Sequence, residues 1–269
     1  PISTLFPYTT FFRSSSRLED RFGSAFSGKY KSLFLANQGP KKERLEKLLD
    51  AVAEVYSSLC GPDPLEYRAE RGLLDVREEM GIIIQEVVGS RMGDYFLPAY
   101  PGIALSSNEF LWSHRIKRED GLIRLVPGLG TRAVDRLSND YPILIAPGQP
   151  DLRVNSTPED AARYSPMQMD VINIRTNSFE TICVKDFIRK HSEEYPGVEM
   201  IIGLYLEDRI TRINKFTLDF KRGEPVVTFD GLIEETDFIP LIKKIMALLQ
   251  EELNSPVDIE FASDGKKLY

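Results

Sequence analysis

The hydrophobic pattern predicts two long amphipathic helices. In residues 41–59 apolar side chains recur at intervals of three and four, and they are Leu45, Leu48, Leu49, Val52, Tyr56 and Leu59. Residues 238–253 repeat this spacing with Leu241, Ile242, Ile245, Leu248, Leu249 and Leu253. Each set falls on one side of its helix, so we expect that side to be buried. Gly61-Pro62 ends the first helix, and Asp63-Pro64 can begin another.

Shorter apolar and β-branched segments predict strands. They lie at 30–36, 81–88, 102–105, 122–126, 143–146, 171–174, 200–206, 213–220, 225–229 and 257–261. Residues 81–88 (GIIIQEVV) are apolar almost throughout, which is typical of a buried strand. The last strand turns at Ser263-Asp264-Gly265 and begins to return at Leu268-Tyr269. Because strands and helices do not alternate regularly, the pattern predicts an α+β fold.

Composition narrows the class of protein. A hydrophobic content of 42% with 28% charged residues is typical of a globular protein, and the chain has no apolar run long enough to span a membrane. The net charge of -7 disfavours general nucleic-acid binding, which needs a surplus of Lys and Arg. Cys60 and Cys183 form no C-x-x-C pair, which suits a reducing cytoplasm rather than a disulfide framework. We expect His114 and His191 to be structural or surface residues.

The first fourteen residues, PISTLFPYTTFFRS, stand apart from the rest. They contain no acidic residue, charged n-region or cleavage site, so they do not form a signal peptide. Residues 4–14 look like the translation of a common sequencing-adapter oligonucleotide. We therefore expect residues 1–14 to be non-native and residues 15–269 to form the domain. The alternative is a genuine β-strand rich in Thr, Tyr and Phe.

The chain lacks the motifs of several large enzyme classes. It has no G-x-x-x-x-G-K-[ST], G-x-S-x-G or H-E-x-x-H. Gly128, Gly130 and Ala133 do fit the dinucleotide fingerprint G-x-G-x-x-A. However, Pro127 precedes the first glycine and the strand–helix–strand context is missing. We therefore expect a tight turn from a strand into a helix at 131–137.

Asp258 and Glu260 form the most informative acidic pair. Residues two apart on a strand point to the same face, while Ile259 between them points the other way. Two close carboxylates repel each other unless a cation lies between them, which suits Mg²⁺ bridging nucleotide phosphates. Two ordinary acidic residues at a solvated sheet edge are the alternative.

Three further segments suit a phosphorylated ligand. Residues 85–88 (Gln-Glu-Val-Val) end a strand before a glycine, where free backbone groups can pair with a planar base. Residues 23–28 (GSAFSG) carry small side chains that let the backbone approach a ligand. Arg13 has a planar donor group that suits phosphate oxygens. Its origin is open, because it lies in the adapter-like segment.

Together these stretches resemble the nucleotide-binding domain of the phosphoenolpyruvate synthase and pyruvate phosphate dikinase family. Arg13–Ser16 with Glu19-Asp20 and then Phe26–Lys29 resembles that family's R-S-S…E-D…S-F-A-G-x element. Four later segments are similar to its V-V-V-Q-x-M-V, G-V-A, G-L-G and P-x-D-I-E-W…L-Y elements: 83–88, 102–104, 128–130 and 256–261 with Leu268-Tyr269. The order and spacing of these elements, over nearly everything after residue 14, carry the resemblance.

The resemblance implies an ATP-grasp fold, in which ATP lies between two α+β lobes. It implies that Arg13 contacts phosphates and that Ser27 and Gly28 belong to a flexible loop over them. Gln85, Glu86 and Val88 would form the adenine hinge. Glu260, with Asp258 beside it, would face Mg²⁺, and the catalytic residues would be Arg13 and Glu260.

The resemblance also implies a reaction and its partners. In the family this domain uses ATP and Mg²⁺ to phosphorylate a histidine on a swivelling domain, and AMP is the eventual nucleotide product. The phosphohistidine then serves pyruvate on a third domain, forming phosphoenolpyruvate. Neither His114 nor His191 has the Gly- and Thr-rich surroundings of that histidine. We therefore expect a cytoplasmic enzyme whose phosphohistidine and pyruvate-binding domains are partners of this chain.

Several departures from the family pattern leave alternatives open. Thr131 follows G-L-G where the synthases usually have an acidic residue, and Ser106-Ser107-Asn108 replaces a more basic stretch. The family's upstream lysine and its L-Q-x-R-P segment are missing, so we expect a domain incomplete at both ends and inactive alone. The alternatives are the same ATP chemistry with another acceptor, as in rifampin phosphotransferases or glucan-water dikinases, and an inactive nucleotide-binding module.

Overall fold

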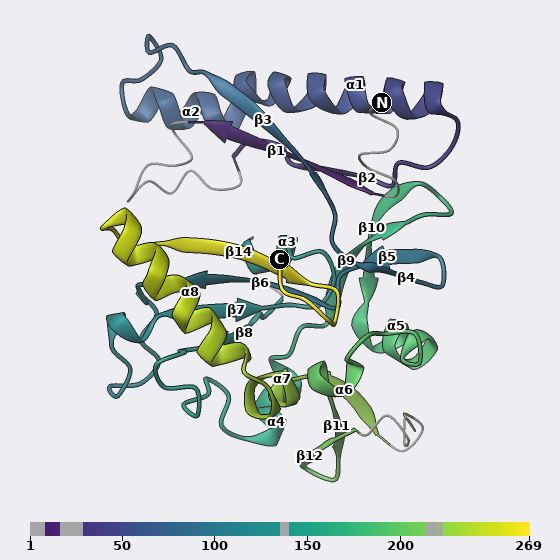
Figure 1. Cartoon of the computed structure of the whole chain (residues 1–269), viewed down its shortest axis with the longest axis vertical. Helices are drawn as coiled ribbons and strands as arrows, with labels where there is room; N and C mark the ends of the chain where they lie inside the picture. The colour runs from purple at the N-terminus through teal and green to yellow at the C-terminus, as the bar shows by residue number, and fades with distance from the viewer. Residues whose placement is uncertain (1–8, 17–28, 135–139, 214–219, 221–222) are drawn as a thin grey trace. The chain divides into compact units, whose positions relative to one another are not determined.

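The computed structural model describes residues 9–16, 29–134, 140–213, 220 and 223–269. Contacts within the chain divide it into two units, which we describe separately (Figure 1). Unit 1 consists of Pro1–Val87, Asp94–Phe96 and Ile172–Glu180. Unit 2 consists of Val88–Gly93, Leu97–Val171 and Thr181–Tyr269.

Unit 1 contains a three-stranded antiparallel sheet in the order β2-β1-β3. The strands are β1 (Thr10–Ser16), β2 (Leu33–Leu35) and β3 (Met80–Glu86). The helix α1 (Lys41–Ser57) packs against one face of this sheet, and Figure 1 shows it running beside the strands. Phe12 of β1 is completely buried there with Ala51 and Val55 of α1. A short turn, η2 (Ser58–Cys60), leads into α2 (Pro62–Glu70).

The strand β1 corrects one expectation about the N-terminal segment. Residues 10–14 were expected to lie outside the fold, yet they form most of β1 and alternate between buried and half-buried positions. Ser14–Ser16 continue the strand to its end. The alternative of a genuine strand therefore describes residues 10–14 correctly. The non-native origin of residues 1–14 stays a prediction.

The predicted burial is also wrong for β3 and partly wrong for α1. The strand β3 lies at the edge of its sheet, and Ile83 and Ile84 are 42% and 36% exposed. The apolar run therefore does not form a strand buried on both faces, because Ile83 and Ile84 point to opposite faces of the sheet and both are exposed. In α1 the helix is confirmed, but Leu45, Leu49 and Tyr56 are exposed. Ala51 and Val55 are its buried residues.

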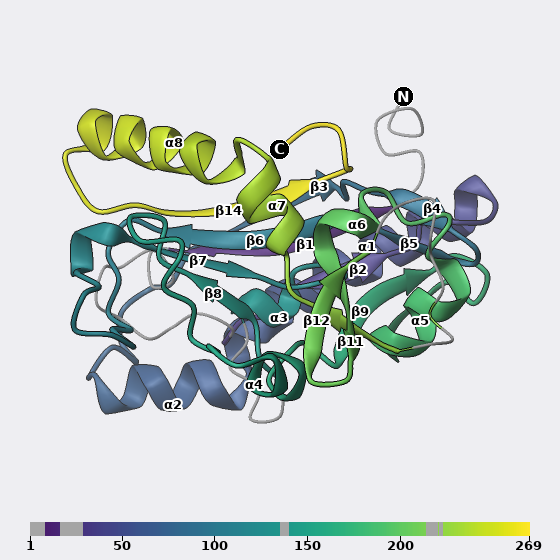
Figure 2. The ribbon, with the colours of Figure 1, turned by 90° about the horizontal axis from the view of Figure 1, so that it is seen from below.

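Unit 2 is built around an antiparallel sheet in the order β14-β6-β7-β8. These strands are β6 (Tyr100–Leu105), β7 (Leu122–Leu125), β8 (Ile143–Ile145) and β14 (Asp258–Ser263). One face is covered by α8 (Phe238–Leu253), as Figure 2 shows. The rings of Phe238 and Phe261 lie 5.6 Å apart, so helix and sheet share an aromatic contact.

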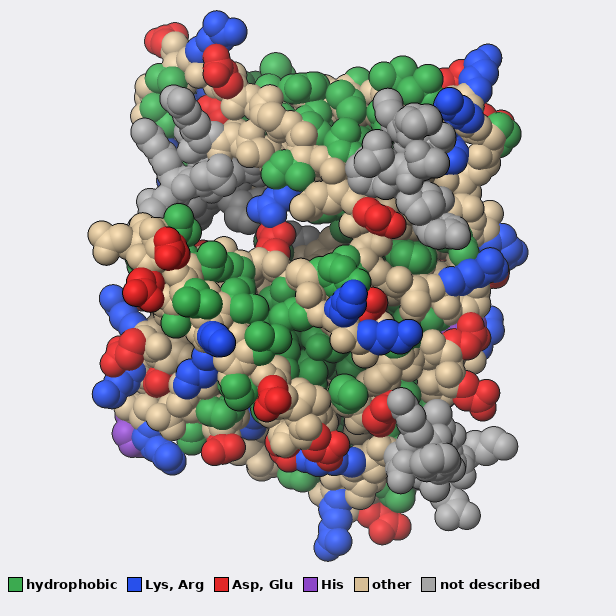
Figure 3. Space-filling model, in the orientation of Figure 1, with side chains coloured by type: hydrophobic (Ala, Val, Ile, Leu, Met, Phe, Trp, Pro, Cys, Tyr) green, Lys and Arg blue, Asp and Glu red, His purple; other side chains and the backbone are tan. Residues whose placement is uncertain are grey.

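The helix α8 is confirmed, and its buried side is narrower than predicted. Ile242 and Met246 are buried, and Ile245 and Leu249 are half-buried. Leu241, Leu248 and Leu253 were expected to face inward but are exposed. Figure 3 shows hydrophobic side chains along this helix, with acidic and basic side chains interspersed around them.

A second sheet in unit 2 has the order β12-β11-β13. Its strands are β11 (Ile202–Leu206), β12 (Arg209–Arg212) and β13 (Glu224–Val227). A two-residue turn of Glu207 and Asp208, both with positive φ, joins β11 and β12. A further sheet has the order β10-β9-β5-β4. It consists of β4 (Ser90–Met92), β5 (Tyr95–Leu97), β9 (Gln168–Asn173) and β10 (Ser178–Cys183).

Short helices connect the strands of unit 2. They are η3 (Arg118–Asp120), α3 (Thr131–Val134), α4 (Pro158–Arg163), α5 (Val184–His191), α6 (Val198–Ile201) and α7 (Asp230–Glu235). The mixture of helices with antiparallel sheets confirms the predicted α+β class. His191 ends α5 and is only 7% exposed, so it is a buried residue and not a surface one. Within the described ranges, no helix has the length and apolar character needed to cross a membrane.

Candidate functional site

Arg13 and Gln85 lie on the same face of the unit 1 sheet. The strands β1 and β3 are paired in the register Phe11–Gln85 and Arg13–Ile83, and directly paired residues point to the same side. This is the side opposite α1, because Phe12 points toward that helix. Gln85 is exposed and Arg13 half-buried. One sheet face therefore presents a guanidinium and an amide near each other.

The predicted hinge segment lies where the chain leaves unit 1. Gln85 and Glu86 are the last residues of β3, and both side chains are exposed. The backbone N–H of Val87 donates to the carbonyl of Thr9, 3.2 Å away, which extends the pairing of β1 and β3 by one bond. Val88 is the first residue of unit 2. Ser27 and Gly28, the predicted loop residues, lie outside the described residues.

Asp258 and Glu260 lie side by side on one face of β14. Both are exposed, whereas Phe261, on the opposite face, is buried near α8. The strand therefore has the alternation that the sequence predicts. Desolvation by the surrounding chain raises the pKa of the Asp258 carboxyl. A raised carboxyl pKa means that the ionised form lacks full compensation, which a bound cation would supply.

Arg124 of β7 shares this face with the acidic pair, and sequence reasoning missed it. Glu260 pairs with Ile103, and Ile103 pairs in turn with Arg124. These residues form one row across three strands, so the side chains of Glu260 and Arg124 start roughly 10 Å apart. A single charged residue inside the apolar strand L-I-R-L was the available signal. The face thus combines two carboxylates with a guanidinium.

Asp258 and Glu260 suit Mg²⁺, which also binds water and phosphate oxygens, better than a metal ion that is bound by protein side chains alone. Across the described part of the chain, no cluster of three or more His, Cys, Asp or Glu side chains is placed to bind a metal. Mg²⁺ usually takes one or two carboxylates and completes its coordination with water and phosphate oxygens. The pair Asp258 and Glu260 is sufficient for that donor set.

The turn Gly128-Leu129-Gly130 adopts backbone conformations that favour glycine. Gly128 and Gly130 have φ values of 84° and 93°. A Cβ atom on Gly128 would lie 2.5 Å from the carbonyl oxygen of Asp170, which also accepts a bond from the Leu129 N–H. The expected tight turn into a helix is confirmed as far as Val134, and the rest of 131–137 is not described. The turn is therefore a close backbone contact with β9.

A buried ionic network lies behind this turn. The Arg132 guanidinium donates to Asp140 Oδ2 at 2.6 Å and to Asp170 Oδ1 at 3.2 Å, and the three side chains are less than a tenth exposed. Burial by itself would lower the pKa of Arg132, but the two carboxylates outweigh it and raise that pKa. The Thr131 hydroxyl donates to Asp170 Oδ2 at 2.5 Å. Thr131 thus has a carboxylate beside it, but that carboxylate is engaged by Arg132 and by Thr181.

Residues 106–108, which replace a more positively charged stretch of the family, form hydrogen bonds within the fold. The Ser106 hydroxyl accepts from the Val257 N–H at 2.8 Å, which ties the end of β6 to the start of β14. Asn108 is completely buried, and its Oδ1 accepts from the Phe110 N–H. The contact between Ser106 and Val257 holds the start of the strand that carries Asp258 and Glu260.

Comparison with known proteins gives one family match. A family model described as pyruvate phosphate dikinase, AMP/ATP-binding domain, matches residues 8–269, which is nearly the whole chain. The match includes the strand β1 and both acidic residues of β14. A search of curated proteins finds no match.

Proposed function

Because the chain belongs to the family of pyruvate phosphate dikinase AMP/ATP-binding domains, we propose that it is the ATP-using domain of a dikinase-type phosphotransferase that phosphorylates a histidine on a partner domain. The family binds ATP and AMP and has the ATP-grasp type of α+β fold. The final acceptor in this proposal is pyruvate, which becomes phosphoenolpyruvate. The observation that carries the proposal is the acidic pair of β14, placed on one face within a chain that matches the family throughout.

The open face of the unit 1 sheet would bind the nucleotide. Arg13 provides planar N–H donors for phosphate oxygens. The side chain of Gln85 and the backbone of 86–88 would pair with the adenine base, with Ser27 and Gly28 in the loop over the phosphates. Arg13 and Gln85 lie on a common sheet face, which supports a shared ligand.

Asp258 and Glu260 would hold Mg²⁺ in unit 2. When bound with ATP, the ion neutralises phosphate charge that builds up during phosphoryl transfer. The two carboxylates orient the ion from a strand whose register is held by six residue pairs to β6. Arg124, on the same face, would add a positive charge toward phosphate oxygens.

The acceptor histidine would come from another domain. His191 is 7% exposed, and its Nδ1 lies 3.3 Å from Glu194 Oε1, so the incoming phosphoryl group has little room there. His114 is exposed, beside Arg115 and away from any of the predicted site residues in the sequence. Within the described residues neither histidine suits a relay, which supports an acceptor outside this chain.

The test is product analysis with the complete protein that contains this domain. We expect ATP to be converted to AMP, and phosphoenolpyruvate to appear when pyruvate is added, as followed by ³¹P NMR. AMP without phosphoenolpyruvate would replace pyruvate with another acceptor. ATP binding without any AMP formation would contradict the phosphotransferase proposal and identify an inactive nucleotide-binding module.

A further inference from the structure

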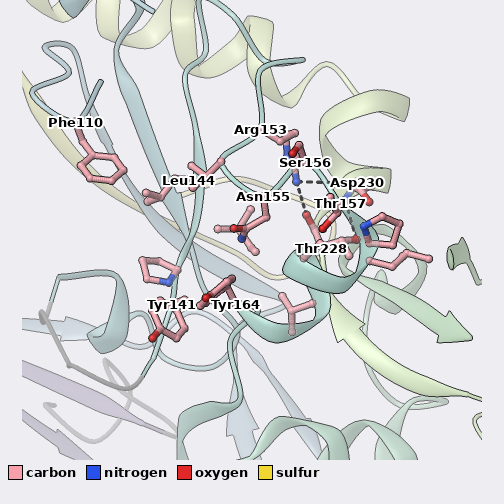
Figure 4. Close-up of a pocket in the computed structure, with 17 residues that line it drawn as sticks. Phe110, Tyr141, Leu144, Arg153, Asn155, Ser156, Thr157, Tyr164, Thr228 and Asp230 are labelled. Carbon is pink, nitrogen blue, oxygen red and sulfur yellow. Dashed lines mark hydrogen bonds and ion pairs between the residues drawn. The ribbon is translucent and has the colours of Figure 1, made fainter. Parts of the chain in front are cut away.

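Unit 2 contains a cavity of about 490 Å³ that includes none of the predicted nucleotide or metal residues. Its wall is formed by β8 with the preceding residues, the segment 153–158, α4, and parts of β12, β13 and α7. Figure 4 shows Tyr141 and Tyr164 toward one end of the lining and the pair Arg153–Asp230 toward the other. The volume falls within the range of ordinary small-molecule sites.

The cavity has an aromatic and mostly apolar wall. The rings of Tyr141 and Tyr164 lie 5.2 Å apart and nearly perpendicular. Tyr141 is 42% exposed and Phe110 is 52% exposed, although both line the cavity. Leu144 and Val227 complete this apolar wall. Aromatic side chains that remain exposed around a concave surface favour a ligand with a planar ring.

The charges of the lining cancel. Arg153 donates to Asp230 Oδ1 at 3.1 Å and to the carbonyl of Thr228 at 2.9 Å. Among the described lining residues no other side chain is charged. An anionic ligand would have to compete with Asp230 for Arg153, and a cationic one with Arg153 for Asp230. The lining therefore favours an uncharged ligand.

Asn155 supplies hydrogen-bonding groups that no described residue of the chain uses. Its side chain has no hydrogen bond within the part of the chain that the structure describes, and Ser156 beside it is in the same situation. An amide offers two N–H donors and a carbonyl acceptor. These groups match the polar edge of a heteroaromatic ring, which has both donors and acceptors.

A residue with positive φ lies between two residues of the wall, Thr228 and Asp230. Phe229, between Thr228 and Asp230, has φ 57° although it is a bulky residue, and it is completely buried. Such a conformation is unfavourable for a bulky residue, and residues of this kind are concentrated at ligand clamps and switch regions. Arg153 bonds to the residues on both sides of Phe229 and holds them in the wall. The strain is thus located where a ligand would contact Asp230.

We propose that this cavity binds an uncharged planar heteroaromatic compound, with its ring against Tyr141 and Tyr164 and its polar edge on Asn155. The cavity is a site separate from the predicted nucleotide residues, and the inference does not rest on the proposed phosphotransferase activity. The pair Arg153–Asp230 closes the end opposite the tyrosines and rejects charged analogues.

The single tryptophan of the chain provides a built-in reporter. Trp112 lies 5.9 Å from Phe110, and its indole N–H donates to the carbonyl of Leu152, next to Arg153. The probe is benzimidazole, an uncharged ring with one donor and one acceptor, at mildly alkaline pH. We expect saturable quenching of Trp112 fluorescence by benzimidazole, and affinity at least about tenfold weaker for benzimidazole carboxylate, the same ring with a negative charge.

Variants test the location of the site. Tyr141→Ala and Asn155→Ala should each weaken benzimidazole binding about tenfold, whereas Tyr56→Ala, an exposed tyrosine outside the cavity, should not. Asn155→Asp adds a charge with almost no change in shape, so it replaces the alanine variants in this test if they fold poorly. It should also weaken benzimidazole binding. Absence of saturation, equal binding of the carboxylate, or unchanged affinity in the cavity variants would overturn the proposal. Displacement of benzimidazole by saturating ATP would show that the cavity is not separate from the nucleotide site. Benzimidazole binding is expected whether or not the protein has phosphotransferase activity.

Discussion

At the scale of single residues, alternation along a strand decides which side chains can act together. Asp258 and Glu260 share a face of β14, and Arg124 joins them through the register of β6 and β7. Arg13 and Gln85 share a face of the unit 1 sheet for the same reason. Asp258, Glu260 and Gln85 are exposed and contribute little to the core, so their substitution separates function from folding.

Glu260→Ala is the sharpest residue-scale test of the proposed function. In the complete protein we expect it to abolish ATP-dependent phosphoryl transfer, because it removes one of two carboxylates for Mg²⁺. The midpoint of thermal unfolding should stay within a few degrees of wild type, since the residue is exposed and fills no core volume. AMP formation and circular dichroism measure the two effects. Glu252→Ala, exposed on α8, is the matched control, and near wild-type activity of Glu260→Ala would remove Glu260 from the metal site.

The raised pKa of Asp258 predicts that Asp258→Asn differs from wild type in stability by an amount that depends on pH. Its pKa is raised in the folded protein, so the folded state holds the proton more tightly than the unfolded state. The stability from that proton is present below the ordinary carboxyl pKa of 3.8 and is lost as pH rises through the raised value. Asp258→Asn should therefore be more stable than wild type at neutral pH, with the difference shrinking in acid. Urea unfolding at several pH values measures this, and a difference independent of pH would contradict it.

At the scale of elements, the connection between β7 and α3 has a buried ionic network beside its buried apolar residues. Arg132 joins Asp140 and Asp170, and the backbone of Gly128 and Leu129 lies directly against Asp170. The two positive φ values allow the turn, and the ion pairs fix the element that follows it. Removing Arg132 would leave the carboxylates of Asp140 and Asp170 buried without this positive charge.

Arg132→Met should therefore destabilise unit 2 strongly. Removing one partner of a buried ionic group typically costs about 3–5 kcal/mol, because the remaining carboxylates stay buried and charged. Urea unfolding measures the free energy of unfolding. Arg115→Met, which replaces an exposed arginine, should change that free energy by less than about 0.5 kcal/mol. Equal effects of the two substitutions would show that the network does not stabilise the fold.

At the scale of the whole molecule, the two units each have apolar residues that are completely buried. Phe12 is buried against α1 in unit 1, and Ile123 of β7 is buried in unit 2. The burial of Phe12 matters beyond stability, because it lies in the segment whose origin the sequence leaves open. A buried side chain in the central strand of a sheet is a structural residue whatever its source.

Phe12→Ala and Ile123→Ala should each act on their own unit. Truncation of a buried Phe or Ile typically costs about 2–5 kcal/mol, through lost apolar burial and the cavity left behind. Amide hydrogen exchange should accelerate in α1 and β3 for Phe12→Ala, and in β6 and β8 for Ile123→Ala. Unchanged exchange in unit 1 after Phe12→Ala would mean that β1 does not belong to the fold.

The sequence alone determined the features that depend on local periodicity. Helices α1 and α8, most of the strands, the terminal hairpin and the shared face of Asp258 and Glu260 all follow from periods of 3.6 and 2 and from turn residues. The sequence set residues 10–14 aside because residues 4–14 look like a translated adapter, and the structure places residues 10–14 in β1. The origin of the segment stays a prediction.

Only the tertiary structure decided which sides are covered and which distant residues meet. Ile83 and Ile84 of the edge strand β3 are exposed, and so are several leucines of α1 and α8, because a helix buries only the side that meets its sheet. Arg124 reaches the face of Glu260 through strand order, and Arg132 meets Asp170 across 38 positions of sequence. Such contacts depend on pairing between segments far apart in the chain, which no local pattern of side chains encodes.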